Sequence, residues 1–434
     1  MLTPEAQAVE VSLRSRSAPA LLPPDLDGEF VLPEYKGHSL VNIPATLGEL
    51  LGAPLAGISP PLDKAYWSQM ASGVRRVVLV LLDALGYLQL GEMLRIDPSC
   101  VWLRQAQYGV LLPMTSIYPS TTNTALATLL TGVEPIAHGL LGYELWLREY
   151  GVLAEMLSLK PAYGTGRETL MDYGLTPETF LPVPCLGELL GPKGVRTTAI
   201  VPAPFTRGTL TRMCYRGFSR LFGYTNVDGM WSIARYVLSH DDIGRDLYML
   251  YWGGIDSTIH NRGAHGGFWE EQFRAVSRAC ETQFLAQLTP REREGTLLVM
   301  IADHGFVDTP ESLAHDTESD PVLRRELLAP YAGEARAAYL YCFGGDSDGS
   351  LQAIQGALGP NYVVRRSREV VQAGLFGDRA PAPESLPRLG HFHVISRGQH
   401  YLDHRKLRLK LRGRHGGLTP DEMLVPWLAT RLDD

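Results

Sequence analysis

Aspartate and histidine side chains recur shortly after the most apolar runs of this sequence. These runs span residues 75–82, 246–251 and 296–301. The side chains that follow them are Asp83, Asp256, His260, Asp303 and His304. A further histidine, His415, lies in an Arg-His-Gly-Gly segment near the end of the chain. Because ligands of open α/β sheets gather at the carboxyl ends of the strands, we expect these carboxylates and imidazoles to share one site.

Three carboxylates and three imidazoles form a suitable ligand set for two divalent metal ions. The mixture favours zinc, and manganese and iron are the competing ions. Each residue taken alone also has a structural explanation, because an aspartate after a strand commonly caps a helix or forms a turn. A lone histidine is more often a hydrogen-bonded structural residue. The joint occurrence of the whole set favours the metal site.

A candidate nucleophile lies in the segment TSIYPSTTNTALATLLTG, which predicts a turn and then a buried helix over residues 124–131. Ser120, Thr121 and Thr122 stand at the junction. A hydroxyl there lies near the free amides and the dipole of the helix N-terminus, which favour an anion. Coordination to a metal ion would lower its pKa enough to make it a nucleophile near neutral pH. Taken alone, the three hydroxyls are better explained as helix caps.

Apolar strands alternate with helices through most of the chain. Continuous aliphatic runs, typical of parallel strands buried on both faces, cover residues 75–82, 197–201, 246–251 and 296–301. Helices are expected at residues 124–131, 228–239 and 268–288, and an amphipathic helix is expected within SLVNIPATLGELLG. This alternation predicts a doubly wound α/β sheet with right-handed crossovers.

A different pattern begins near residue 305. Two strand-like runs and a helix between them lie at residues 337–343, 391–395 and 349–357. We therefore expect residues 305–412 to form an inserted α+β lobe. Within this lobe, residues 404–412 alternate basic and aliphatic side chains, which predicts a strand with one basic face. Such a face is most often simply solvated, and the competing interpretation is attraction of a phosphorylated substrate.

The composition excludes several classes of protein. Forty Lys and Arg against 47 Asp and Glu give a net charge of −7, which disfavours a general electrostatic nucleic-acid binder. Five scattered cysteines form no CxxC pair and no disulfide framework. The longest aliphatic run, residues 77–82, is too short for a membrane helix. Residues 1–30 predict a loosely attached arm without a signal-peptide pattern, so we expect a cytoplasmic protein.

Six motifs follow one another along the chain: LLDALGY, PSTTN to LLTG, HGLLGY, DSTIH, ADHG and RHGGLTPDEMLVP. In this order they resemble the type I phosphodiesterase/nucleotide pyrophosphatase family of the alkaline phosphatase superfamily. The segment EYKGHSLVNIPATLGELLG is also similar to a leader of bacterial members, and the match covers most of residues 35–430. The resemblance implies an alkaline-phosphatase-like fold, a doubly wound, mostly parallel sheet with a small inserted lobe. The expected division is an arm over residues 1–34, a catalytic domain over residues 35–304 and 413–434, and the lobe over residues 305–412.

The same resemblance implies roles for the candidate residues. One metal ion would be held by Asp83, Asp303, His304 and the nucleophile, and the other by Asp256, His260 and His415. Thr122 matches the nucleophile by its spacing to the Thr-Gly pair that closes the helix, and Thr121 is its nearest competitor. The implied reaction is hydrolysis of phosphate diesters or pyrophosphates through a covalent phospho-threonine. The implied partner is a phosphorylated small molecule or a nucleotide.

One position departs from the family pattern. Many relatives carry an asparagine shortly after the His-Gly pair, where its amide contacts a phosphate oxygen, whereas this chain has Tyr143 and Glu144 there. That contact is therefore absent, made by Asn123, or replaced by Tyr143. The substrate preference stays open as a result. A phosphomonoesterase, a phosphotransferase of the same superfamily and a non-catalytic phosphate-binding member are the competing functions.

Overall fold

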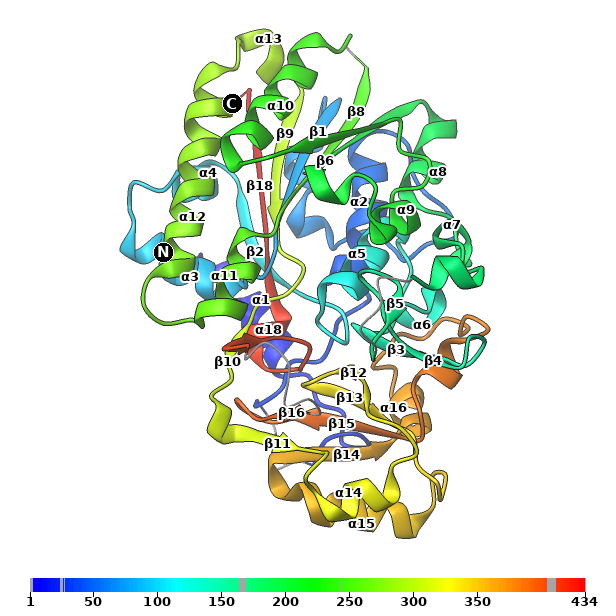
Figure 1. Cartoon of the computed structure of the whole chain (residues 1–434). Coiled ribbons are helices and arrows are strands. Elements are labelled where there is room, and N and C mark those ends of the chain that lie inside the picture. The colour runs from blue at the N-terminus through cyan, green and yellow to red at the C-terminus, as the bar shows by residue number, and fades with distance from the viewer. Residues whose placement is uncertain are drawn as a thin grey trace.

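The computed structural model describes residues 3–23, 26, 28–163, 169–242, 244–403 and 411–433. Its strands form a large sheet in the upper part of Figure 1 and a second sheet below it. Residues 404–410 lie outside the described residues, and most of the predicted basic strand over residues 404–412 falls there.

The large sheet has seven strands in the order β2-β18-β9-β1-β8-β6-β7. In that order their bounds are Val110–Thr115, Leu424–Arg431, Thr296–Ile301, Arg76–Leu82, Arg245–Trp252, Val195–Pro202 and Arg220–Tyr224. The pairs from β9 to β7 are parallel, and β18 is antiparallel to both of its neighbours. The sheet is therefore mostly parallel, as the aliphatic runs predict.

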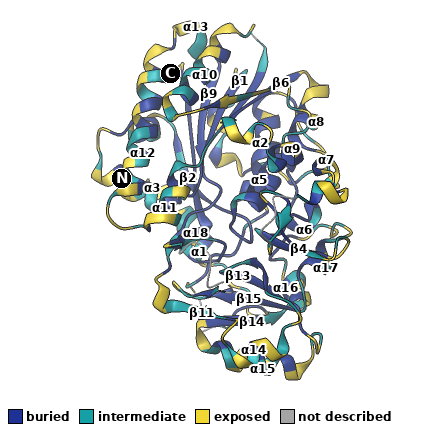
Figure 2. Cartoon of the chain, viewed as in Figure 1, coloured by how far each residue is buried: buried dark blue, intermediate teal, exposed yellow. Residues whose placement is uncertain are grey.

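Helices cover both faces of the large sheet, because its central strands are apolar on both sides. Every residue of β1 and β9 is buried (Figure 2). On one side lie α4 (Val101–Tyr108), α10 (Val227–His240) and α12 (Phe268–Ala279), and on the other α2 (Ile43–Leu50), α5 (Thr122–Thr131) and α8 (Leu186–Leu190) (Figure 1). The predicted mixed α/β fold with a mostly parallel central sheet is confirmed.

Further helices and two short strand pairs lie elsewhere in the chain. The helices are α3 (Tyr87–Ile96), α6 (Pro135–His138), α7 (Pro177–Phe180), α9 (Thr209–Cys214), α11 (Gly254–Arg262), α13 (Pro290–Arg293), α16 (Ser367–Gln372), α17 (Ser385–Arg388) and α18 (Pro420–Met423). The two-stranded pairs are β10 (Val307–Asp308) with β17 (Gly413–Arg414), and β11 (Ala314–Asp316) with β16 (Tyr401–Asp403). Among the described residues, no helix combines the length and apolarity needed to cross a membrane.

The C-terminal strand β18 lies inside the large sheet although it contains a proline. Proline has no N–H to donate, and it is normally confined to sheet edges. Pro426 lies opposite Pro113 of β2, and the pairing of β18 with β9 begins one residue later, at Trp427 and Ile301. Pro426 therefore lies beyond the end of β9 and interrupts no hydrogen-bonded pair with it.

The second sheet is antiparallel, with the order β14-β15-β13-β12-β3-β4-β5. In that order its strands are Tyr362–Arg366, Phe392–Ser396, Ala337–Leu340, Ala332–Glu334, Glu144–Leu147, Val152–Glu155 and Lys160–Pro161. One face packs against α15 (Asp348–Leu358) and α14 (Pro321–Glu326). Successive residues of a strand point to opposite faces. Phe392 and Val394 of β15 accordingly join the α15 cluster, and Ile395 joins the core shared with the large sheet.

The second sheet combines two segments that lie far apart in the sequence. Strands β12 to β15 come from the predicted lobe of residues 305–412, whereas β3 to β5 come from residues 144–161, which the sequence placed in the catalytic domain. Gly333 pairs with Glu144 where the two segments meet. The strands β3 to β5 have four, four and two residues, too few to show a strand pattern in the sequence. The division of the chain into domains stays a prediction.

The N-terminal segment differs from the loosely attached arm that the sequence predicts. Pro4–Arg14 forms helix α1, and the side chain of Thr3 caps it by accepting from the amide of Ala6 at 3.1 Å. Ala6 and Leu13 are buried, and Val9 packs against the same core. The spacing of these three residues places them on one helical face. That stripe attaches the segment to the molecule.

Candidate active site

Five segments of the chain meet at one edge of the large sheet. Strands β1, β8 and β9 are adjacent and parallel, so their carboxyl ends lie together. β2 runs in the same direction, because β18 is antiparallel to both β2 and β9. The carboxyl end of β2, which leads to α5, and the amino end of β18 therefore reach the same edge. This is the edge at which open α/β sheets bind ligands.

The first group of ligands consists of Asp83, Asp303 and His304, and all three side chains are buried. His304 Nε2 lies 3.5 Å from Asp83 Oδ1 and 3.7 Å from Asp303 Oδ2. Within the described part of the chain, these two carboxylate oxygens are buried without a hydrogen-bond partner. Burial and the carboxylate of Asp303 raise the pKa of Asp83 well above its usual value. A cation between the groups would satisfy both oxygens, so the residues fit a metal ion.

The remaining oxygens of these carboxylates are held by the protein. Asp83 Oδ2 accepts a hydrogen bond from the phenol of Tyr251, near the end of β8. Asp303 Oδ1 accepts from the backbone amides of Ala84 at 3.1 Å and His304 at 3.0 Å. Each carboxylate therefore has one oxygen oriented by the fold and one free to coordinate an ion.

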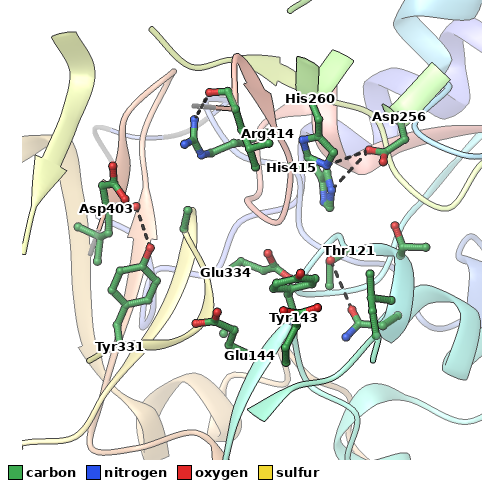
Figure 3. A pocket seen from close by; sticks show the side chains of 18 residues that line it. Thr121, Tyr143, Glu144, Asp256, His260, Tyr331, Glu334, Asp403, Arg414 and His415 are labelled. Carbon is green, nitrogen blue, oxygen red and sulfur yellow. Dashed lines mark hydrogen bonds and ion pairs between the residues drawn. The ribbon is translucent and has the colours of Figure 1, made fainter. Parts of the chain in front are cut away.

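The second group consists of Asp256, His260 and His415, which are half-buried. Asp256 and His260 are four residues apart on α11 and so project from the same face of that helix. Asp256 Oδ1 lies 3.2 Å from His260 Nε2 and 3.7 Å from His415 Nε2. Figure 3 shows these three side chains pointing toward one another. In each group, one ligand atom from every residue lies within 4.8 Å of the others, so each group can surround one ion.

The three imidazoles are oriented in the same way. In each ring, Nδ1 lies within hydrogen-bond distance of a backbone carbonyl. The distance is 2.9 Å from His260 to Gly413, 2.9 Å from His304 to Gly305, and 3.1 Å from His415 to Ser120. A carbonyl only accepts, so each Nδ1 carries a proton, and Nε2 is the ring nitrogen that faces the neighbouring ligand groups. Burial, followed by the neighbouring imidazoles of His304 and His260, lowers the pKa of His415 well below its usual value, which keeps the ring neutral. Neutral imidazoles oriented this way are suited to bind metal.

The two groups adjoin each other and Thr122. The rings of His304 and His415 stack with their centroids 3.7 Å apart and an angle of 17° between their planes. Thr122, the first residue of α5, places its Oγ1 3.1 Å from His304 Nε2. Thr121 is 2% exposed, and its hydroxyl lies 3.5 Å from the side-chain oxygen of Asn123. Of the two adjacent threonines, Thr122 therefore presents its hydroxyl to the first group.

A cavity of about 440 Å³ opens over these residues (Figure 3). Thr122, Asp256 and His415 line one wall, and residues of the second sheet line the other. Both predicted substrate contacts, Asn123 and Tyr143, line it as well. The side-chain amide of Asn123 donates to the carbonyl of Gly142 at 2.6 Å, which ties it to the loop before Tyr143. The cavity is large enough for a small phosphorylated ligand.

Residues 77–418 match the family model described as type I phosphodiesterase/nucleotide pyrophosphatase. The chain belongs to this family. The predicted resemblance is thereby confirmed, and the family makes this chain a metal-dependent phosphoester hydrolase of the phosphodiesterase/pyrophosphatase type. No curated protein matches the sequence significantly.

Solved structures show the same fold at low sequence identity. Murine ectonucleotide pyrophosphatase/phosphodiesterase 5 superposes with a TM-score of 0.61 at 14% identity, over 82% of this chain and 87% of that protein. Phosphonoacetate hydrolase from Sinorhizobium meliloti 1021, in complex with phosphonoformate, gives a TM-score of 0.59 at 16% identity, over 82% of this chain and 89% of that protein. An inactive variant of the murine protein, with threonine replaced by alanine, was solved in complex with AMP.

The site of this phosphodiesterase-family chain also contains residues whose roles the sequence did not indicate. Tyr251 holds Asp83, Ser120 holds His415, and Arg414, Tyr331 and Glu334 line the cavity. Tyr251 had a detectable signal in the sequence, because its hydroxyl ends the apolar run 246–251, five residues before Asp256. Ser120 and Tyr331 lie in loops, Glu334 ends β12 of the second sheet and Arg414 ends β17, so the place of each depends on tertiary contacts.

Proposed function

We propose that this chain hydrolyses phosphate diesters or pyrophosphates, with Thr122 as the nucleophile that carries the phosphoryl group between two half-reactions. The main support is the 3.1 Å distance between Thr122 Oγ1 and His304 Nε2, beside two buried carboxylate oxygens that have no hydrogen-bond partner among the described residues. The inactive threonine-to-alanine variant of the murine structural neighbour, solved with AMP, also supports a threonine nucleophile and a nucleotide-like substrate.

Two divalent cations, which we propose to be zinc, would be held at the site. One would be bound by Asp83, Asp303, His304 and Thr122, and the other by Asp256, His260 and His415. When bound, they would lower the pKa of the Thr122 hydroxyl and stabilise negative charge on the phosphoryl group. Manganese and iron are the competing ions for these nitrogen and oxygen ligands. Elemental analysis of protein purified without chelator tests the assignment, and a metal content near zero contradicts it.

The residues of the chain position the reaction. Thr122 stands at the N-terminus of α5, where unpaired amides and the helix dipole favour the negative charge of the attacking oxygen and of the phosphate. We propose that the second N–H of the Asn123 amide, beyond the one bonded to Gly142, contacts a phosphate oxygen, and that Tyr143 contacts the substrate from the cavity wall. Water on the side opposite Thr122 then hydrolyses the phospho-threonine.

A pair of single substitutions tests the nucleophile. Thr122→Ala should lower kcat for bis-p-nitrophenyl phosphate by at least 10³-fold, because the phospho-enzyme cannot form. Thr121→Ala should retain far more activity, because its hydroxyl faces Asn123 instead of the ligand groups. If Thr121→Ala is the more damaging variant, the assignment to Thr122 is wrong.

The competing reactions of the same superfamily predict different products. Hydrolysis of a diester releases one alcohol and a monoester, whereas a phosphotransferase moves the phosphoryl group from Thr122 to an added alcohol. A phosphomonoesterase prefers p-nitrophenyl phosphate to its diester. The complete set of six ligand residues argues against a non-catalytic member. Parallel assays of a diester, a monoester and a dinucleotide polyphosphate, with and without added alcohol, separate these outcomes.

A further inference from the structure

Ser120 joins the nucleophile segment to the loop that carries His415. Its hydroxyl donates to the carbonyl of Gly417 at 2.8 Å and accepts from the amide of Gly416 at 3.2 Å. Its own carbonyl lies 3.1 Å from His415 Nδ1, and Ser120 and Gly416 form an isolated antiparallel bridge. Three polar contacts thus connect two segments that are almost 300 residues apart in the chain.

The loop after His415 depends on such contacts, because two glycines follow the histidine. Gly416 has a φ of +113°, a backbone conformation that side chains disfavour. The amide of Gly417 donates to Glu422 Oε1 at 2.8 Å, and its carbonyl accepts from Ser120. Ser120 and Glu422 therefore both hold this loop through Gly417.

Ser120 has no exposed surface and does not line the cavity. It therefore has no route to touch a substrate. Its effect on chemistry has to pass through the ring that it orients. That ring belongs to His415, whose Nε2 lies 3.7 Å from Asp256 Oδ1 and whose face stacks on His304.

We propose that Ser120 is a positioning residue, whose hydroxyl holds the His415 loop in the place where Nε2 of His415 completes the second ligand group. The inference rests on the proposed function, because it assumes that Asp256, His260 and His415 bind a cation. The aspartate and histidine ligands of the first group come from other segments, after β1 and β9. Loss of the hydroxyl therefore weakens the second group selectively.

The test is a zinc titration of the chelator-treated full-length protein, in the wild type and in Ser120→Ala. This change removes one hydroxyl, leaves the backbone carbonyl in place and adds no volume to a buried site. The wild type is expected to bind two ions. In S120A the zinc affinity of the first group should be unchanged and that of the second group should fall about 10- to 100-fold. This is the range found when a residue that orients a metal ligand is lost. The zinc-binding event that is weakened in S120A should be the same one that His415→Ala abolishes.

Activity against free zinc concentration provides a second readout. The midpoint for S120A should shift to higher zinc by the same factor, and its plateau should approach that of the wild type, because Thr122 and the first group are intact. A misfolded protein would not recover in this way. The matched control is Ser385→Ala. Ser385 is also fully buried, and its hydroxyl donates to the carbonyl of Ile136 at a distance of 2.7 Å, but it does not line the cavity. This variant should keep both affinities.

Two results would overturn the role of Ser120 while leaving the two-ion site intact. One is S120A with both affinities within twofold of the wild type. The other is an equal loss at both groups together with a lowered Tm, which indicates only a general structural role. Fewer than two ions on the wild type would instead overturn the proposed metal site, and the inference about Ser120 with it.

Discussion

Arg336 and Glu422 form a bidentate ion pair in which neither side chain is exposed. Arg336 Nε lies 2.7 Å from Glu422 Oε1, and Nη2 lies 2.9 Å from Oε2. Arg336 stands between β12 and β13 of the second sheet, and Glu422 lies on α18, behind the His415 loop. The pair therefore links the sheet that lines the cavity to the segment that carries a proposed metal ligand.

The pair is stable because its remaining polar groups are also satisfied. Arg336 donates to the carbonyls of Gly398 at 2.8 Å and His400 at 2.6 Å, and Glu422 accepts from Gly417 and from Thr419. Burial alone would raise the pKa of Glu422, but the charge and hydrogen bonds of Arg336 hold it below its usual value.

We expect Glu422→Gln to destabilise the protein by about 3–5 kcal/mol, because it leaves the guanidinium of Arg336 buried without a counter-charge. Urea unfolding measures the loss in the free energy of unfolding. The double variant Arg336→Met/Glu422→Gln should recover part of it, because it removes the unpaired charge. A loss below about 1 kcal/mol in the single variant contradicts this account of the pair.

Tyr251→Phe should weaken the first ligand group selectively. The phenol of Tyr251 donates to Asp83 Oδ2 and so directs Oδ1 toward His304. Its loss is expected to lower the zinc affinity of that group about 10- to 100-fold and to leave the other group unchanged. The same titration that tests Ser120 measures this effect. A loss at the group of Asp256 instead would show that the two groups are not independent.

Asp303→Asn should have opposite effects on the metal-free and the metal-loaded protein. Asp83 and Asp303 are buried close together, and their mutual repulsion is part of what raises the pKa of Asp83. An asparagine keeps the oxygen that accepts from Ala84 and His304 but removes one charge. The metal-free variant should therefore unfold at a higher temperature than the metal-free wild type.

Zinc should then stabilise the wild type more than this variant. An ion at 100 times its Kd adds about 2.7 kcal/mol to the stability of the protein that binds it. Calorimetric scans with zinc and with excess chelator provide the comparison. An Asp303→Asn variant that is less stable than the wild type without metal, or equally stabilised by zinc, contradicts the proposed role of this carboxylate.

Stability should fall in mild acid because His138 is buried in its neutral form. Its Nδ1 accepts from the amide of Leu140 at 3.1 Å, and its Nε2 lies 2.9 Å from the hydroxyl of Thr128. Burial lowers the pKa of His138 to about 3, from the ordinary value of 6.5 for a histidine. Below pH 6.5, His138 therefore binds a proton in the unfolded chain but not in the folded chain. The free energy of unfolding falls as a result when the pH drops from 6.5 toward 3.

This histidine alone should lower the free energy of unfolding by about 2 kcal/mol between pH 7.5 and pH 5. The loss is about 1.4 kcal/mol for each pH unit below the pKa that His138 has in the unfolded chain. Urea unfolding at both pH values measures it. His138→Gln should show a shallower dependence by that amount, whatever its stability at pH 7.5. An unchanged dependence means that His138 is already charged or exposed in the folded state.

The proposed ligand residues other than His415 can be predicted from the sequence because they follow continuous aliphatic runs. Asp83 comes directly after β1, Asp303 comes two residues after the end of β9, and Asp256 lies in the first turn of α11, which follows β8. Parallel strands that are buried on both faces have to align their carboxyl ends. Local pattern and fold class therefore suffice to expect these residues at a common edge.

Other parts of the structure leave no such local pattern. Strand β18 carries Pro426, and it fits inside the sheet only because β9 ends one residue earlier. Strands β3 to β5 are too short to stand out, and they join the second sheet through the pairing of Gly333 with Glu144. Helix α1 is an exception, because its stripe of three apolar residues is a local pattern, although it lies within a segment rich in proline, serine and alanine.

The sequence by itself determined the fold class, the family and the chemical types of the candidate ligands, because hydrophobic patterns and short motifs are local properties of the chain. The tertiary structure alone decided which hydroxyl faces the ligand groups, which nitrogen of each histidine is free, and how Ser120 and Tyr251 orient their neighbours. The contacts of Thr122 with His304, of Ser120 with His415 and of Tyr251 with Asp83 join residues 182, 295 and 168 positions apart. Long-range contacts of this kind depend on how the elements pack, and a local pattern carries no information about that packing.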